Sequence, residues 1–209
     1  MKLAAGAAVL SLLLAAVPCA SAQERQLGAR VGAALSTLEH DTTGEGEYSR
    51  RFGGVGGGFI VLPLANAIAL QLEALYVQKG GKFDLPGIPE TSTIILDYVE
   101  FPLLLRIGPS RAGPGGVYLL TGMSAGLRAM ARRQFSATGR GITSGRSFDI
   151  RDEIAPFEAS AIVGGGFDLH RHVVIDARYA WGLTPVNRDQ TGGFKVRTRV
   201  LSVTAGLRF

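Results

Sequence analysis

The sequence predicts an all-β fold, an eight-stranded antiparallel up-and-down transmembrane β-barrel. Three observations predict it. Apolar residues recur with period two in eight segments, the two faces of these segments differ sharply in polarity, and the joins between them alternate between short and long. The chain is 46% hydrophobic, yet past its first residues no apolar stretch is long enough for a transmembrane helix, so strands would have to cross the membrane.

The first 22 residues are expected to be a cleaved secretory signal peptide, which leaves residues 23–209 as the outer-membrane β-barrel domain. Lys2 supplies a positive start, an apolar run spans Leu3–Val17, and Ala20-Ser21-Ala22 has the small-x-small pattern of a cleavage site. The run is shorter than the roughly 20 residues of a membrane-spanning helix. Cys19 raises lipid attachment as an alternative, which the preceding Pro18 disfavours.

Eight segments with strand periodicity cover most of the remaining chain. In the clearest of them, Ile68–Gln78, Leu70 and Leu72 fall on one face and Gln71 and Glu73 on the other. The other seven are Leu27–Ser36, Phe52–Leu62, Ile95–Ile107, Val117–Arg128, Ala155–Leu169, Val173–Leu183 and Thr198–Phe209.

The connections between these segments predict the orientation of the barrel. Those at 63–67, 108–116 and 170–172 are short, whereas those at 37–51, 79–94, 129–154 and 184–197 are long. Outer-membrane barrels have short periplasmic turns and longer external loops. With an even number of strands, both termini are then expected on the periplasmic side.

The two faces predict lipid outside the barrel and charge inside it. One face is apolar throughout, whereas the other combines glycine with charged residues, and glycine makes room for long side chains in a narrow lumen. The predicted lumen charge cluster can neutralise itself by pairing five acids with five arginines: Arg30, Glu73, Glu100, Arg106, Arg128, Glu158, Asp168, Asp176, Arg178 and Arg208. Eight strands enclose only enough space for side chains, so we expect a charged plug and no open pore.

Five stretches of the chain carry scaffold motifs: Leu70–Lys82, Asp97–Arg106, Gly164–Asp168, Ala177–Leu183 and Leu201–Phe209. Together they resemble the small outer-membrane β-barrel family that includes the PorT-like proteins. The resemblance extends over most of the chain and implies the outer membrane of a Gram-negative cell envelope. The terminal Phe209, preceded by alternating apolar residues, resembles the signal read by the barrel assembly machinery during insertion.

The sequence contains no recognisable catalytic constellation, so an enzyme is not expected. Hydrolysis by a nucleophilic serine needs a histidine beside it, held by a carboxylate. His170 and His172 lie in a short predicted turn, where solvated side chains explain them better than a metal pair. His40 lies near Ser36 and Asp41, but no histidine and serine share a lipid-facing strand.

No cofactor or metal is expected either. The glycine runs Gly54–Gly58 and Gly164–Gly166 precede no helix, so they lack the structural basis of a phosphate-binding loop. The acidic residues Asp41, Glu45 and Glu47 lack the ligand spacing of a calcium loop.

The long connection 129–154 is the candidate for surface binding. Arginine binds phosphate bidentately, and lipopolysaccharide phosphates lie at the external rim of such a barrel. The predicted polyanion-binding residues are Arg132, Arg133, Arg140, Arg146 and Arg151. The alternative is that these charges only keep a long loop soluble.

Three hypotheses about function follow. The first is a structural or surface-binding barrel whose external loops contact outer-membrane lipid, lipopolysaccharide or an unknown surface partner. The second is a lipid-modifying enzyme, and the third is a PorT-like accessory protein of a secretion system. Nucleic acid is excluded as a partner because the export signal directs the chain away from it.

Overall fold

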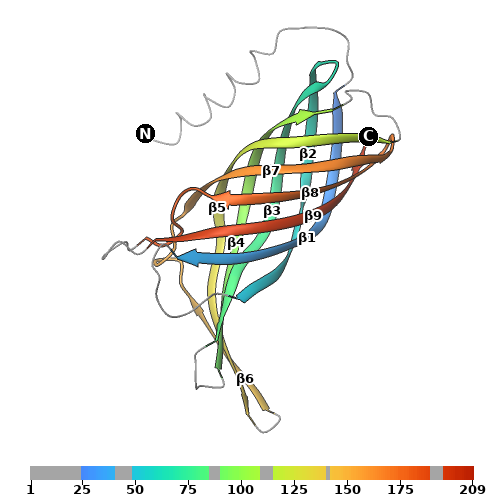
Figure 1. The fold of residues 1–209 in the computed structure, drawn as a ribbon. Helices are drawn as coiled ribbons and strands as arrows, with labels where there is room; N and C mark the ends of the chain where they lie inside the picture. Colours follow the sequence, from blue (N-terminus) through green and yellow to red (C-terminus); the bar gives the residue numbers. More distant parts are fainter. Residues whose placement is uncertain (1–24, 41–48, 85–89, 109–114, 140–141, 189–194) are drawn as a thin grey trace.

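The computed structural model describes residues 25–40, 49–84, 90–108, 115–139, 142–188 and 195–209, and these residues form one antiparallel sheet (Figure 1). The expected signal peptide, residues 1–22, lies outside them. No helix in the described part of the chain is long and apolar enough to cross a membrane. The strands are β1 (Gln26–His40), β2 (Ser49–Ala65), β3 (Ile68–Asp84), β4 (Glu90–Ile107), β5 (Gly116–Gly139), β6 (Ile142–Asp149), β7 (Phe157–His170), β8 (Val173–Gly182) and β9 (Val196–Arg208).

Eight of the described strands close into a barrel. The order around the sheet is β4-β3-β2-β1-β9-β8-β7-β5, and pairing between β4 and β5 completes the ring. Every neighbouring pair is antiparallel. The predicted fold is therefore confirmed, and it places no unpaired sheet edge in the lipid.

The first and last strands meet at the end of the barrel that carries the short turns. Gly28 is opposite Arg208, and the amide of Phe209 donates a 2.8 Å hydrogen bond to the carbonyl oxygen of Leu27. The β2–β3 and β7–β8 turns lie at this same end (Figure 1). The long connections therefore lie at the opposite end, which is the external end in the predicted orientation.

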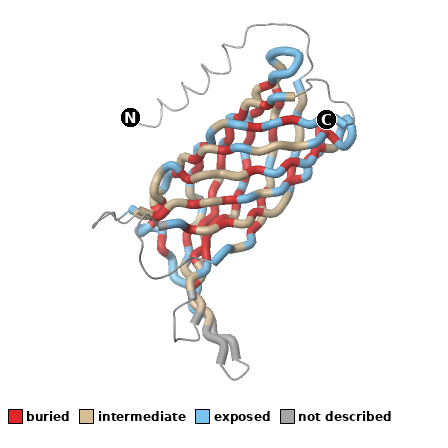
Figure 2. Tube along the Cα trace, viewed as in Figure 1, coloured by how far each residue is buried: buried red, intermediate tan, exposed pale blue. Residues whose placement is uncertain are grey.

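The outer surface of the barrel is apolar. Val31, Val117 and Val203 are each more than half exposed, whereas Glu158 and Asp168 in the lumen are 1% exposed. Buried and exposed residues alternate along the strands (Figure 2). Such an arrangement is the reverse of a water-soluble protein, and it is what contact with lipid requires.

The strands extend further than the sequence analysis predicted. The connection expected at 79–94 is mostly strand, because β3 continues to Asp84 and β4 begins at Glu90. The connection expected as a loop at 129–154 was also assigned wrongly: β5 continues to Gly139 and β6 pairs with it as a hairpin. Antiparallel pairing continues beyond the membrane because each added residue pair satisfies further backbone groups.

Two lumen glycines make room for aromatic rings. A Cβ on Gly28 would collide with the ring of Phe59, and one on Gly166 would collide with that of Tyr118. The Arg30 guanidinium lies 4.3 Å from the centre of the Phe59 ring, and that of Arg106 lies 3.5 Å from the centre of the Tyr118 ring. The glycines thus accommodate charged side chains indirectly, through the rings on which the guanidinium groups stack.

Candidate functional site

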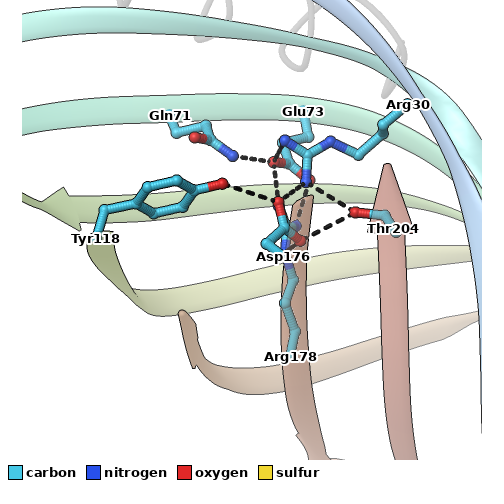
Figure 3. A network of polar contacts seen from close by, with 7 residues as sticks. All are labelled: Arg30, Gln71, Glu73, Tyr118, Asp176, Arg178 and Thr204. Carbon is cyan, nitrogen blue, oxygen red and sulfur yellow. Dashed lines mark hydrogen bonds and ion pairs between the residues drawn. The ribbon is translucent and has the colours of Figure 1, made fainter. Parts of the chain in front are cut away.

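Four charged residues form the central layer of the lumen (Figure 3). The guanidinium of Arg178 binds Glu73 bidentately, with Nη1–Oε2 and Nη2–Oε1 distances of 2.6 and 2.9 Å. Arg178 Nε also donates to Asp176 Oδ1 at 2.8 Å, and Arg30 Nη1 donates to Asp176 Oδ2 at 2.7 Å. Because each acid contacts both arginines, the layer is a closed set of two cations and two anions.

Neutral side chains complete the hydrogen bonding of these carboxylates. Gln71 donates to Glu73, and the hydroxyl of Thr204 donates to Asp176 Oδ1 at 2.9 Å. The hydroxyl of Tyr118 lies 3.4 Å from Asp176 Oδ2 (Figure 3). Buried ion pairs are tolerated when the remaining lone pairs are satisfied in this way.

A second layer lies towards the periplasmic end. Asp168 accepts hydrogen bonds from Arg106 Nη2 at 2.7 Å and from Arg208 Nη2 at 2.9 Å. Arg208 also donates to the side-chain oxygen of Gln26 at 3.0 Å. The charged residue beside the C-terminal Phe209 is therefore part of the buried lumen.

A third layer lies towards the external end and contains a residue that the sequence analysis missed. Lys79 is 1% exposed and forms ion pairs with Glu100 and Glu158, the latter at 3.1 Å. Thr198 donates a further hydrogen bond to Glu158. The predicted segment ended at Gln78, but the period of two that places Glu73 inside also places Lys79 inside.

Arg128 does not belong to this network, which corrects its predicted place in the lumen charge cluster. It is partly exposed, and its Nη1 donates to the backbone carbonyls of Arg151 and Ile154. The alternation of β5 does turn Arg128 inward. Its position along β5, however, is beside the turn that contains Arg151 and Ile154, whose backbone carbonyls accept its hydrogen bonds. With Lys79 in its place, the lumen network still contains five cations and five anions: Arg30, Glu73, Lys79, Glu100, Arg106, Glu158, Asp168, Asp176, Arg178 and Arg208.

A small cavity lies beside the network. A cavity of about 30 Å³ lies next to Lys79, Glu100 and Arg178. A water molecule needs roughly 10–15 Å³ measured in the same way, so this volume has room for about two.

Four cations follow the apolar belt on the outward face of the external end, and we call them the rim cations: Lys82, Arg132, Arg197 and Arg199. Arg199 pairs with Glu39 at 2.6 Å. Trp181 is opposite Arg199, and its ring contacts that of Tyr179 edge to face, with centroids 4.7 Å apart. Of the four, the sequence analysis singled out only Arg132.

The hairpin beyond the barrel forms an external arm, which we define as Arg132–Gly139 of β5 together with β6 (Figure 1). Residues opposite each other in an antiparallel pair share a face. Arg133 is opposite both Phe148 and the buried Ile94, and Phe135 is opposite Arg146. One face of the arm therefore combines two arginines with two phenylalanines, and it continues the inner wall of the lumen.

Four of the five arginines predicted to bind polyanions are among the described residues, and these four do not form one cluster. Arg132 lies on the outward face, whereas Arg133 and Arg146 lie on the inner face of the arm. Arg151 lies in the turn after β6, where its Nε is 3.6 Å from Asp149. Arg140 lies outside the described residues. The predicted set is thus divided by the alternation of the hairpin.

A closed barrel with an apolar exterior and paired charges inside defines an integral membrane β-barrel protein. The family model described as outer membrane protein beta-barrel domain matches residues 21–188. The chain therefore belongs to this family of outer-membrane proteins. The match supports the predicted small-barrel family and the outer-membrane location, but it does not single out the PorT-like members.

Several solved structures are similar to this chain in their fold. The attachment invasion locus protein Ail of Yersinia pestis is 19% identical, with 90% of this chain and 100% of that chain covered and a TM-score of 0.47. Neisserial surface protein A is 15% identical, with the same coverage and a TM-score of 0.48. OprG from Pseudomonas aeruginosa is 12% identical, covers 88% and 95%, and has a TM-score of 0.42. No curated protein sequence matches the chain.

Proposed function

We propose that this protein is a non-enzymatic outer-membrane barrel with a surface-binding role, held among lipopolysaccharide phosphates by its rim cations. The observation that carries the proposal is their position. All four lie on the outward face directly beyond the apolar belt, which is the level of the phosphate groups in the outer leaflet.

Lys82 and Arg132 are the strongest part of this surface. Lys82 is opposite Thr93 and Arg132 is opposite Ile95, so the two cations flank β4 on the same outer face. Two strand spacings of about 4.8 Å and an offset of two residues along β4 separate their backbones by about 12 Å, a distance that two long side chains can span around one phosphate group. Both residues are exposed.

The external arm has a different task in this proposal. Its face with Arg133, Phe135, Arg146 and Phe148 is on the lumen side, away from neighbouring lipid. Phe148 is half exposed, and the Phe135 and Phe148 rings are 6.0 Å apart. Arginine and aromatic side chains are enriched in protein interfaces, so this face suits a partner that approaches from outside the cell.

The lumen supports a binding role over a channel role. Ion pairs span its cross-section in three layers, and the cavity beside them has room for about two water molecules. We propose that these layers close the barrel, since opening a path would separate buried charges.

Binding of purified lipopolysaccharide to the protein in lipid nanodiscs tests the proposal. The double variant Lys82→Glu/Arg132→Glu should bind at least thirtyfold more weakly, because each lost cation near an anionic surface costs about 1 kcal/mol and the new carboxylates add repulsion. The matched control is Arg171→Glu, an exposed arginine in the β7–β8 turn at the opposite end. Unchanged binding of the double variant, or an equal loss in the control, would contradict the proposal.

Two other functions stay predictions with tests of their own. A lipid-modifying enzyme would alter the mass spectrum of lipid A when the gene is present. A PorT-like accessory protein of a secretion system would co-purify with components of that system. An unchanged lipid A profile would exclude the lipid-modifying enzyme, and an absence of such components would exclude the accessory protein.

A further inference from the structure

The external end of the lumen contains a cavity of about 480 Å³, which we call the mouth cavity. Its floor and walls are aliphatic, and the residues that form them come from five separate parts of the chain: Leu38, Ile94, Leu96, Ile154, Val186 and Val196. All of them are at most 8% exposed. The cavity is thus lined by side chains of a buried apolar cluster.

Backbone hydrogen bonds hold one wall of the mouth cavity in place. The segment Leu183–Arg188 lies between β7 and β9: the amide of Val186 donates to the carbonyl of Val196 at 2.8 Å, and that of Ala155 donates to the carbonyl of Val186 at 2.7 Å. The amide of Arg188 donates to the carbonyl of Glu153 at 2.8 Å. Because hydrogen bonds fix this segment to neighbouring segments on both sides, this wall of the cavity is held in a defined position.

A buried aromatic ring lies between the mouth cavity and the lumen network on β4. Along the inward face of β4, Leu96 lines the cavity, Tyr98 is completely buried, and Glu100 belongs to the network. The Tyr98 ring centre lies 5.2 Å from Lys79 Nζ, so this ring separates the aliphatic residues from the charges. A molecule in the cavity would therefore bind in a blind pocket.

The size and lining of the cavity indicate the kind of molecule that fits. Protein interiors contain few voids larger than a water molecule, and cavities lined by aliphatic side chains stay dry and bind small apolar molecules. Pockets for small organic ligands measure about 300–1,000 Å³ and are mainly apolar with a few polar groups. The mouth cavity meets both conditions.

The polar rim of the cavity indicates the charge of the ligand. Two arginines and two acids line it, and Arg133 Nη2 lies 3.2 Å from Glu153 Oε2. Asp152 and Arg188 supply the other two charges, so the rim has no excess of either sign. A charged ligand would gain little from this rim and would lose hydration on entering the aliphatic interior.

We infer that the mouth cavity is a binding site for an uncharged, mainly apolar small molecule that reaches it from outside the cell. The inference goes beyond the proposed lipopolysaccharide contact, because the cavity uses none of the rim cations. In this view the external end of the lumen binds a ligand, and the ion-paired layers in the membrane-embedded part close the barrel to passage.

Cysteine alkylation of the protein in nanodiscs tests whether the cavity is open to small molecules. In a Cys19→Ser background, Ile154→Cys places a thiol in the cavity wall, and Ile150→Cys places one in the same buried cluster away from the cavity. N-ethylmaleimide should modify the first at least tenfold faster. Equal rates would overturn the inference.

Protection by two matched probes tests the chemistry of the ligand. We expect 1-naphthol, which is uncharged at neutral pH, to slow alkylation of Ile154→Cys at least fivefold, and naphthalene-1-sulfonate to have no effect. Calorimetry should then show that Val186→Trp, which fills the cavity, loses 1-naphthol binding while it keeps the heat-modifiable migration of a folded barrel. Absence of protection, equal protection by the sulfonate, or undiminished binding by a folded Val186→Trp variant would overturn the inference.

Discussion

The inner wall of this barrel differs between its membrane-embedded region, where buried ion pairs lie among apolar clusters, and its external region, where the buried side chains are aliphatic. Where the outer surface is apolar, the inner wall carries ten ionisable side chains in ion pairs, and a cavity of about 30 Å³ lies beside three of them, Lys79, Glu100 and Arg178. Where the outer surface carries the rim cations, the inner wall is aliphatic around a cavity of about 480 Å³. On β4 the change occurs at Tyr98, between Leu96 in the mouth cavity and Glu100 in the network. The same strands can therefore have charged side chains inside and apolar ones outside within the membrane, and the arrangement of a soluble protein beyond it.

The two regions should therefore respond differently to mutation. In the membrane-embedded region, removal of one partner leaves a buried charge without compensation. In the external region, removal of an aliphatic side chain loses contacts beside space that is already empty. The three predictions below test this difference, from the largest expected effect to the smallest.

Arg178→Met should lower the free energy of unfolding by about 3–5 kcal/mol, because it leaves Glu73 and Asp176 with one arginine between them. Denaturant unfolding of the protein in detergent micelles measures the effect. Adding Glu73→Gln should recover part of the loss, since it removes one of the two carboxylates that the first substitution leaves sharing a single arginine. A loss below 1 kcal/mol would show that the central layer does not depend on these pairs.

Leu104→Ala and Leu96→Ala compare aliphatic packing in the two regions. Leu104 packs tightly with Leu120 and Ile162 in the lumen, so its truncation should cost about 4 kcal/mol. Leu96 borders the mouth cavity, so its truncation should cost about 2 kcal/mol. Both side chains are completely buried, which makes them a matched pair. Equal losses in denaturant unfolding would indicate that the mouth cavity is as well packed as the lumen.

Glu153→Gln should change the free energy of unfolding by less than about 0.5 kcal/mol. It breaks the ion pair with Arg133, but the two side chains are 59% and 36% exposed, and exposed pairs contribute little. Thermal unfolding in two salt concentrations measures it. A loss above 1 kcal/mol would mean that the rim of the mouth cavity is held by electrostatics and not by backbone hydrogen bonds.

The sequence was sufficient to predict which faces are buried, and less able to predict how far each strand extends. Alternation is a local property, so Glu73 and Asp176 could be placed inside from their neighbours alone. Lys79 was missed because the predicted segment ended at Gln78, six residues before the end of β3 at Asp84. Arg128 was placed on the correct face, but its height above the network depends on the pairing of β5 with β4 and β7.

The surface site was the least predictable part. A count of arginines in 129–154 suggested one polyanion-binding loop, whereas the hairpin assigns Arg132 and Arg133 to opposite faces. A prediction that continued the period of two through Gln134, Phe135 and Ser136 would have separated them. The other rim cations lie on β3 and β9, and only closure of the sheet brings these strands into one ring with β5.

The sequence by itself determined the number of membrane strands, their apolar and charged faces and the end at which both termini meet. These follow from local periodicity, because every outward residue in the membrane must suit lipid. Tertiary structure alone decided which charges pair and where the mouth cavity forms. Arg30 and Asp176 are 146 residues apart, and the cavity gathers side chains from five segments. Such contacts depend on the register in which the barrel closes, and no local pattern in the chain encodes that register directly.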